Sequence, residues 1–291
     1  MLGADKGGAV TFALVLAGGG VAGIAWELGV LQGIADTDEA LAAKVIGADT
    51  IIGTSAGSVV AVQITSGTPL ATLYERQLAG YSNEIAVDVD LTAMLAGWVE
   101  ATEQATDDVD RRRRIGALAL AADTVDEDTR RAVIATRLPG TEWPDRDVRI
   151  TAVDAHTGEL VVFTAGSGVP LVDAVGASCA VPGVWPPVTV DGRRYVDGGV
   201  RSASNADLAK GADRVLLITP MPPDLARGWG ADLDTELAEL ASARVQVVPA
   251  DQATVAAFGT NPLDPTTRAP SARAGRDVGR AAAPAVQALF D

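Results

Sequence analysis

Two glycine-rich segments of the sequence carry groups that could perform acyl transfer. The first is Gly53-Thr-Ser-Ala-Gly57, a G-x-S-x-G pattern in which the hydroxyl of Ser55 can act as a nucleophile. The second is Gly18-Gly-Gly-Val-Ala-Gly23, which presents several backbone N–H groups at the start of an expected helix. Such a loop suits an oxyanion that forms during acyl transfer, and it suits the pyrophosphate of a dinucleotide equally well.

A serine nucleophile needs a base, and the composition narrows the choice. The chain has a single histidine, His156, within Asp154-Ala-His-Thr-Gly158. These residue types are typical of a solvated turn. We therefore do not expect a Ser–His–Asp triad, and another group has to accept the proton of Ser55.

Asp197, in Tyr195-Val-Asp-Gly-Gly199, is the strongest candidate for this base. It follows an expected strand, and Gly198 and Gly199 allow another backbone to approach closely. A carboxyl group with an ordinary pKa of about 3.9 is a weak base, but burial would raise that pKa and improve the match to a hydroxyl. Asp154 and Asp173 remain alternatives.

The glycine loop also fits the dinucleotide pattern G-x-G-x-x-G. That fingerprint requires an acidic residue about 20 positions later, at the end of the second strand. Asp36, Asp38 and Glu39 lie at this distance, but in a polar turn before the next expected strand. A nucleotide- or phosphate-binding protein therefore stays open as an alternative.

The composition excludes several classes of function. The 291 residues include 23 Lys and Arg against 38 Asp and Glu, a net charge of −15, which argues against general nucleic-acid binding. The single cysteine, Cys179, rules out an internal disulfide and a Cys-rich metal site, and it suits a reducing compartment. A magnesium or calcium ion bound by carboxylates stays open. We nevertheless expect no metal or organic cofactor, and we expect a cytoplasmic location. The sequence gives no indication of an oligomeric state.

Two uncharged stretches are long enough to cross a membrane, namely residues 7–26 and 50–74. Both contain glycines at a density that would break a helix in lipid. Asp5 beside Lys6 also argues against a signal peptide. We therefore expect buried core elements here.

The pattern of apolar residues predicts an α/β fold, a three-layer sandwich with a mostly parallel central sheet flanked by helices. Apolar runs at 11–17 and 49–53 are expected strands, and each is followed by a glycine turn and an apolar helix. Further strands are expected at 149–155, 159–163, 188–190, 193–196, 214–219 and 244–249.

We expect one domain over residues 1–291, with a helical insertion at about 80–138 and a C-terminal extension at about 220–291. In the insertion, a capping box at Thr124 to Glu127 predicts a helix that ends near Leu138. An apolar stripe of Leu91, Met94, Leu95 and Trp98 faces either the core, an acyl channel or a membrane. The run Arg111 to Arg114 is either a solvated face or a site of transient contact with anionic lipid headgroups.

Taken together, the sequence resembles the patatin-like phospholipase family. The resemblance rests on four ordered motifs: Gly18 to Gly23, Gly53 to Gly57, Ala177-Ser-Cys-Ala-Val-Pro-Gly-Val-Trp-Pro-Pro187 and Asp197 to Gly199. It covers residues 11 to about 200 and is loose beyond about 220. Many bacterial members carry Arg or Lys at the position of Ala22.

The resemblance implies a serine acyl hydrolase with Ser55 as nucleophile, Asp197 as its only partner in a Ser–Asp dyad, and oxyanion-hole N–H groups from Gly18, Gly19 and Gly20. Gly23, Gly53, Gly57, Gly198 and Gly199 would support these motifs. The substrate would be a phospholipid, a lysophospholipid or a simple acyl ester. A catalytically inactive family member that serves as an interaction module is a further alternative.

Overall fold

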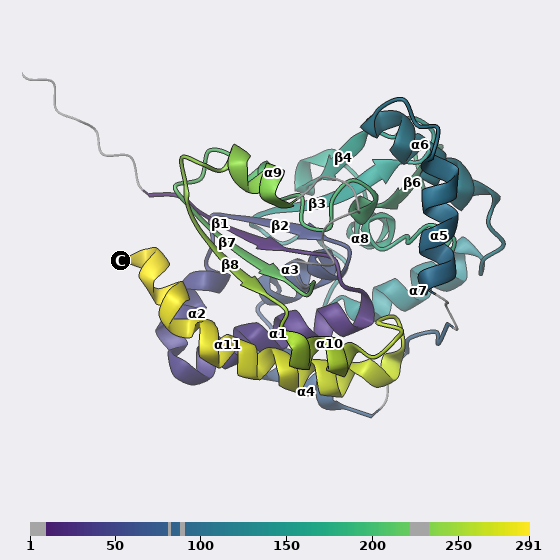
Figure 1. The fold of residues 1–291 in the computed structure, drawn as a ribbon. Helices are drawn as coiled ribbons and strands as arrows, with labels where there is room; N and C mark the ends of the chain where they lie inside the picture. Colours follow the sequence, from purple (N-terminus) through teal and green to yellow (C-terminus); the bar gives the residue numbers. More distant parts are fainter. Residues whose placement is uncertain (1–9, 81–82, 88–90, 222–232) are drawn as a thin grey trace, which may run out of the picture.

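The apolar runs of the sequence form the central strands of one sheet. A computed structural model describes residues 10–80, 83–87, 91–221 and 233–291, and within these ranges eight strands pair into a single sheet (Figure 1). The strands are β1 (Phe12–Leu16), β2 (Thr50–Thr54), β3 (Asp147–Asp154), β4 (Leu160–Phe163), β5 (Val188–Val190), β6 (Arg193–Asp197), β7 (Arg214–Thr219) and β8 (Arg244–Pro249).

The helices follow the strands along the chain and cover both faces of the sheet. They are α1 (Gly20–Thr37), α2 (Glu39–Ile46), α3 (Ala56–Thr65), α4 (Leu70–Leu78), α5 (Leu91–Thr102), α6 (Asp108–Ala121), α7 (Glu127–Arg137), α8 (Leu171–Ser178), α9 (Leu233–Glu239), α10 (Gln252–Phe258) and α11 (Arg268–Phe290). Short 3-10 helices add η1 (Ala165–Ser167), η2 (Gly198–Val200), η3 (Ala206–Ala209) and η4 (Pro265–Thr267).

The sheet is mostly parallel, as the sequence predicts. The strand order is β5-β6-β3-β2-β1-β7-β8, and β4 pairs with β3. The five strands from β3 to β8 in this order run parallel to their neighbours, whereas β4, β5 and β6 pair antiparallel. The predicted strands at 149–155 and 159–163 pair as one hairpin and those at 188–190 and 193–196 as another, whose turn has Asp191 and Gly192 at positive φ, as a type I′ turn requires.

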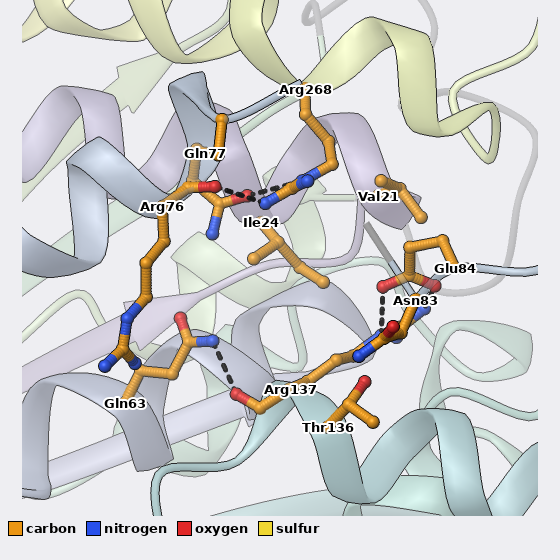
Figure 2. Close-up of a pocket in the computed structure, with 11 residues that line it drawn as sticks. Val21, Ile24, Gln63, Arg76, Gln77, Asn83, Glu84, Thr136, Arg137 and Arg268 are labelled. Carbon is orange, nitrogen blue, oxygen red and sulfur yellow. Dashed lines mark hydrogen bonds and ion pairs between the residues drawn. The ribbon is translucent and has the colours of Figure 1, made fainter. Parts of the chain in front are cut away.

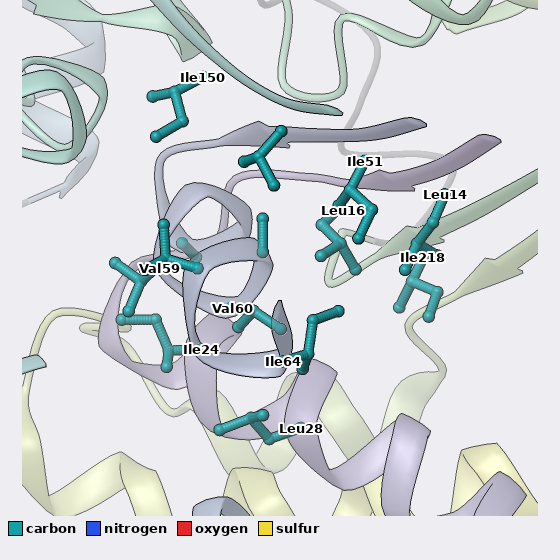
Figure 3. Packing of buried hydrophobic residues seen from close by; sticks show 14 of the residues in the cluster. Leu14, Leu16, Ile24, Leu28, Ile51, Val59, Val60, Ile64, Ile150 and Ile218 are labelled. Carbon is teal, nitrogen blue, oxygen red and sulfur yellow. The ribbon is translucent and has the colours of Figure 1, made fainter. Parts of the chain in front are cut away.

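Side chains alternate between the two faces of the sheet, and each face meets its own helices. Leu14, Leu16 and Ile218 point to the face covered by α1, α3 and α11 (Figure 3). Their neighbours Val15 and Leu217 point to the other face, against residues of η3 and α9. The three-layer α/β sandwich is thus confirmed. In their described parts, both uncharged stretches form mostly buried strands and helices of this sandwich, and none of the helices in the described ranges combines the length and apolar character needed to span a bilayer.

The predicted helical insertion contains α5, α6 and α7, and in its described part it forms no strand. The helices α5 and α6 pack through Trp98 and Ile115 on the face of the sheet near β3 and β6. The predicted capping box is wrong by two residues. The cap of α7 is Asp126, whose Oδ1 accepts a hydrogen bond from the backbone N–H of Thr129 at 2.8 Å, whereas the Thr124 hydroxyl donates to the carbonyl of Val125.

The C-terminal region is joined to the rest of the fold through β8 and α11. The strand β8 pairs with β7, and α11 lies along α1 (Figure 1). The backbones of α1 and α11 come close because α11 has glycines where it faces α1. A side chain at Gly275 would meet the carbonyl of Trp26, and one at Gly279 would meet the carbonyl of Val30. Residues 222–232 lie outside the described residues.

This close approach predicts opposite effects of alanine at two helical glycines. Gly275→Ala should lower the free energy of unfolding by about 1–3 kcal/mol, because the added methyl group overpacks the contact with α1. Gly97→Ala, in α5, should not lower it and should raise it by up to about 1 kcal/mol, because no atom lies within 4 Å of the added carbon and alanine favours helix. Urea denaturation of both variants checks this. Equal stability of the two would contradict the packing that we describe.

Candidate active site

Ser55 occupies a sharp turn between β2 and α3. Its backbone has φ 51° and ψ −113°, a conformation that residues with a side chain rarely adopt and that costs about 1–3 kcal/mol. The turn brings α3 so close to β1 that a side chain at Gly57 would overlap the carbonyl of Leu16. The sequence pattern G-x-S-x-G therefore forms the strand–turn–helix geometry that a serine nucleophile occupies in hydrolases with this motif.

Three neighbouring side chains hold this strained turn. The backbone N–H of Ser55 donates to Oγ of Ser178 at 2.9 Å. The carbonyl of Ser55 accepts from the Ser58 hydroxyl at 2.7 Å and from the Cys179 thiol at 3.3 Å. Ser178 and Cys179 belong to the Ala177–Pro187 motif. This motif therefore stabilises the turn that contains Ser55.

The strand β3 places Asp197 next to this turn. Ile150 of β3 pairs with Gly53 of β2 and with Phe163 of β4, so these two strands lie on opposite edges of β3. Ala152 pairs with both Val161 of β4 and Asp197 of β6. Hence β2 and β6 share the same edge.

Along this shared edge, β2 and β6 approach each other end to end. Thr54, the last residue of β2, lies beside Thr151, and Asp197, the last residue of β6, lies beside Ala152. The two predicted catalytic residues, Ser55 and Asp197, are therefore brought together where the two strands end.

Burial controls the electrostatics of Asp197. Asp197 is 5% exposed and Ser55 is 7% exposed. Desolvation raises the pKa of the Asp197 carboxyl to about 7, although hydrogen bonds from the Gly199 backbone and the Ser55 side chain act in the opposite direction. The Gly199 N–H donates to Oδ1 of Asp197 at 2.7 Å. A carboxyl group with this pKa is matched to proton transfer near neutral pH.

The end of α8 and the residues directly after it hold the backbones of both Ser55 and Asp197. Ser178 binds the backbone of Ser55, and two residues later the carbonyl of Ala180 accepts the N–H of Asp197 at 3.0 Å. A buried network supports the same end of the sheet: the Asn205 side chain donates to Oγ1 of Thr54 at 3.1 Å and to the carbonyl of Ser202 at 2.9 Å. Sequence reasoning missed Asn205, because no motif marks it.

The glycine loop differs in one respect from the prediction. The N–H of Gly18 donates to the carbonyl of Ala203 at 2.8 Å, so this proton is not available to an oxyanion. Within the described residues, the N–H groups of Gly19 and Gly20 have no hydrogen-bond partner, and neither does that of Ala56, directly after the nucleophile. Ala56 was not among the predicted residues, although the residue after the serine commonly donates to an oxyanion in this type of turn.

An apolar cavity of about 230 Å³ opens onto these groups. Its floor contains Ser55, Asp197 and the loop Gly18 to Gly20. The surrounding apolar wall consists of Met94, Leu95, Trp98, Val181, Val200, Met221, Pro262 and Leu263. The apolar stripe of α5 thus faces this cavity through Met94, Leu95 and Trp98, and Trp98 also belongs to the core. The side chain of Leu91 lies outside the described residues.

The rival candidates lie elsewhere. His156 is exposed, at the turn between β3 and β4. Asp154 accepts the N–H groups of His156 and Thr157 and forms an ion pair with Arg193. Asp173 pairs with Arg131 of α7 at 2.6 Å. In the described part of the chain, no group of three or more His, Cys, Asp or Glu side chains is placed to hold a metal ion.

The arginine run of α6 is largely engaged within the protein. Arg113 and Arg114 both pair with Asp110, and Nε of Arg112 donates to the carbonyl of Gly158 at 2.6 Å. Arg111 lies 3.6 Å from a carboxylate oxygen of Asp108. Two carboxylates, Asp108 and Asp110, thus partner three of the four guanidinium groups, and contact of this run with anionic lipid headgroups stays a prediction.

Comparison with known proteins places this arrangement in a family. Three solved structures are similar at low sequence identity. The type III effector protein ExoU is 16% identical with a TM-score of 0.41, and VipD from Legionella pneumophila is 12% identical with a TM-score of 0.45. The third, full-length SpcU in complex with full-length ExoU from the type III secretion system of Pseudomonas aeruginosa, is 18% identical with a TM-score of 0.36.

The alignments cover 96%, 96% and 92% of the present chain, in the same order, but only 53%, 67% and 52% of the other chains. The chain thus spans about half the length of the ExoU chain. The sequence profile described as "Patatin-like phospholipase" matches residues 14–210, more than half of the chain and all four motifs. The protein therefore belongs to the patatin-like phospholipase family.

Proposed function

We propose that this protein is a serine acyl hydrolase that cleaves carboxylic ester bonds of lipids or simple acyl esters through a Ser55–Asp197 dyad. The observation that carries the proposal is the buried Asp197 carboxyl beside Ser55, at the floor of an apolar cavity. A base with a pKa near the working pH and a nucleophile within its reach are the two requirements of such catalysis.

The reaction runs in two halves. Asp197 takes the proton of the Ser55 hydroxyl while Oγ attacks the ester carbonyl, and the leaving alkoxide recovers that proton as the C–O bond breaks. Water then gives a proton to Asp197 and attacks the acyl-enzyme. The acid is released, and the proton returns to Oγ of Ser55.

Backbone N–H groups stabilise the tetrahedral oxyanion in both halves. Gly19 and Gly20 are the donors that we assign within the glycine loop, and Ala56 adds a third from the start of α3. Each such donor contributes about 3–4 kcal/mol to transition-state stabilisation, since it is already oriented when charge develops. Gly18 shapes the loop through its bond to Ala203.

The apolar wall of the cavity supports an acyl chain as the bound part of the substrate. Met94, Leu95 and Trp98 of the insertion line it from one side, and Met221, Pro262 and Leu263 line it from the other. Burying an alkyl chain against this wall contributes roughly 0.8 kcal/mol per methylene group. The insertion and the C-terminal region thereby select the acyl group.

The nucleotide-binding alternative loses two of its three candidate acidic residues. Asp36 forms ion pairs with Arg276 and Arg280 of α11, and the Asp38 side chain caps α2. Neither carboxylate is therefore free to bind a ribose in the way that the dinucleotide fingerprint requires. An inactive interaction module would have no need for a buried, unpaired carboxyl beside Ser55.

The proposal is tested with a fluorophosphonate probe, which reacts with activated serines. We expect the native protein to be labelled at Ser55 and to hydrolyse short acyl esters, and Ser55→Ala to lose both activities. Ser242→Ala, at an exposed serine between α9 and β8, serves as the control and should behave as the native protein does. Labelling of Ser55→Ala at the native rate would refute the assignment.

The raised pKa of Asp197 predicts how activity depends on pH. Because the carboxylate is the base, kcat/KM should increase with pH up to about 7 and stay level above it, as long as ester hydrolysis is rate-limiting. A profile that instead levels off near pH 4 would show that the base has an ordinary carboxyl pKa.

The same pKa predicts a gain of stability in Asp197→Asn. A folded-state pKa above the unfolded value means that the native protein loses stability as pH rises from about 4 to about 7, where the buried carboxyl has to ionise. Asn does not ionise, so the variant should be inactive and more stable than the native protein at pH 8, with the difference shrinking toward pH 4. Thermal unfolding at both pH values measures this difference.

The bond from Ser55 to Ser178 predicts a positioning effect. Ser178→Ala leaves a buried N–H without an acceptor, which costs about 1–3 kcal/mol of stability and loosens the turn. We expect kcat to fall by about 10- to 100-fold with little change in KM, because Ser178 touches the nucleophile's backbone and no substrate. Ser242→Ala is again the control. An unchanged kcat would show that the turn is held without this bond.

A further inference from the structure

A second cavity, of about 300 Å³, is lined in part by Val21 and Ile24 of α1. Most of its lining side chains are polar, and arginines from three helices are among them: Arg76 of α4, Arg137 of α7 and Arg268 of α11 (Figure 2). Gln63 and Gln77 also line it, and the amide of Gln63 donates to the carbonyl of Arg137 at 2.8 Å. We call it the arginine cavity.

The arginine cavity holds more positive than negative charge. Glu84 is the single acidic residue among those that line it within the described ranges. Arg137 occupies both oxygens of Glu84, with Nε donating to Oε1 at 2.8 Å and Nη2 donating to Oε2 at 2.6 Å. Among the described lining residues, one carboxylate therefore stands against three guanidinium groups, although the overall charge of the protein is −15.

The other two arginines of the cavity differ in their partners. Arg268 donates to the side chain of Gln77 and to the backbone carbonyl of Arg76, and these are not its only interactions. The guanidinium of Arg76 forms no ion pair with the described residues. Figure 2 shows the three side chains around the cavity, with Arg137 directed toward Glu84.

A fourth arginine extends the charge toward the nucleophile. Arg130 of α7 stacks on Trp185, with its guanidinium carbon 3.6 Å from the ring centroid. Its side chain is 6% exposed, its Nη1 lies 4.0 Å from Glu84, and neither Nε nor Nη1 has a hydrogen-bond partner in the described part of the chain. Burial and the neighbouring Arg137 lower the pKa of Arg130 to about 9. Buried charge with unused donors is costly unless an anion accepts from it.

These arginines reach Ser55 through a small pocket between the two cavities. Arg130 and Arg137 line this pocket together with Ser55 and Ala56. Its volume of about 10 Å³ matches one water-sized atom. Ser55 therefore has an apolar cavity on one side and guanidinium groups on the other. Since Ala22 gives the glycine loop no cation, the positive charge beside the nucleophile comes from α7.

We propose that the arginine cavity binds a phosphate group, carried by the substrate as its headgroup or supplied as a separate phosphate ligand. Arg76, Arg137 and Arg268 line this cavity, and Arg130 and Arg137 line the small pocket that also contains Ser55. Guanidinium groups bind phosphate oxygens through paired, charge-assisted hydrogen bonds. The headgroup form rests on the proposed ester hydrolysis, whereas binding of phosphate does not.

The binding arm of the test uses Ser55→Ala protein, so that no turnover interferes. Calorimetry with inorganic phosphate and with glycerol 3-phosphate compares this protein with the same protein carrying Arg76→Gln and Arg268→Gln. We expect the double change to weaken binding by about tenfold or more, the equivalent of one charge-assisted hydrogen bond. Arg131→Gln, on the exposed face of α7 and paired with Asp173, is the matched control and should bind as before.

The catalytic arm compares two esters with the same acyl chain, an acylglycerol phosphate and a neutral acylglycerol. If the phosphate is the headgroup, the double variant should lose about tenfold in kcat/KM for the first ester alone, and inorganic phosphate should compete with it. If the phosphate is a separate ligand, the native protein should turn over both esters alike, and inorganic phosphate should change the rate of both.

Arg76→Gln alone guards against a folding defect, because the Arg76 side chain is exposed and has no ion pair to lose among the described residues. It should keep the native unfolding temperature and show a smaller loss of the same kind. Absence of phosphate binding in the native cavity, together with an unchanged ester preference in the double variant, would overturn the proposal. If no ester is hydrolysed at all, the proposed activity is refuted. The calorimetry still shows whether the arginine cavity binds phosphate.

Discussion

The register of β3 is the constraint on which the site depends. One edge of this strand pairs with the end of β2 at Thr151 and with the end of β6 at Ala152, so two strands that approach each other end to end place Ser55 and Asp197 side by side. A slip of one residue on either strand would turn the pairing residues to the opposite face. The core on both faces of the sheet therefore protects the alignment of the dyad, because each face buries its own set of side chains.

Burial gives Asp197 its basicity at a cost in stability. A buried carboxyl with one backbone donor, Gly199, and one hydroxyl neighbour ionises reluctantly, which is what a base for a serine hydroxyl needs. The rest of the fold has to offset this cost together with the strained backbone of Ser55. Fixed hydrogen bonds do so. Ser178 and Ala180 bind the backbones of Ser55 and Asp197, and Asn205 binds both Thr54 at the end of β2 and the carbonyl of Ser202. A Ser–Asp dyad thus needs a rigid frame more than it needs a third catalytic group.

The sequence predicted the parts of this structure that depend on local patterns. Short apolar runs bounded by glycine predicted the strands, and the four ordered motifs predicted Ser55 and Asp197, which the register of β3 brings together. Features that depend on distant partners were not predictable. The N–H of Gly18 is used by Ala203, about 180 residues away, and the cap of α7 is Asp126, because Thr124 turns its hydroxyl to the neighbouring Val125 carbonyl. Asn205 and the four arginines belong to no pattern, since their neighbours come from other elements.

The apolar cavity and the arginine cavity near Ser55 differ in polarity because different side chains of the insertion and of the C-terminal region line them. The family profile ends at residue 210, yet Met221, Pro262 and Leu263 complete the apolar cavity, and Arg268 completes the arginine cavity. From the other direction, the insertion contributes Trp98 to the first cavity and Arg137 to the second. The proposed dyad and its proposed oxyanion donors come from the ends of two strands, the turn before α3 and the glycine loop, whereas side chains of the insertion and the C-terminal region line the two cavities. Substitutions in α7 would therefore alter the lining of the arginine cavity, whereas the register that brings Ser55 beside Asp197 depends on β2, β3 and β6.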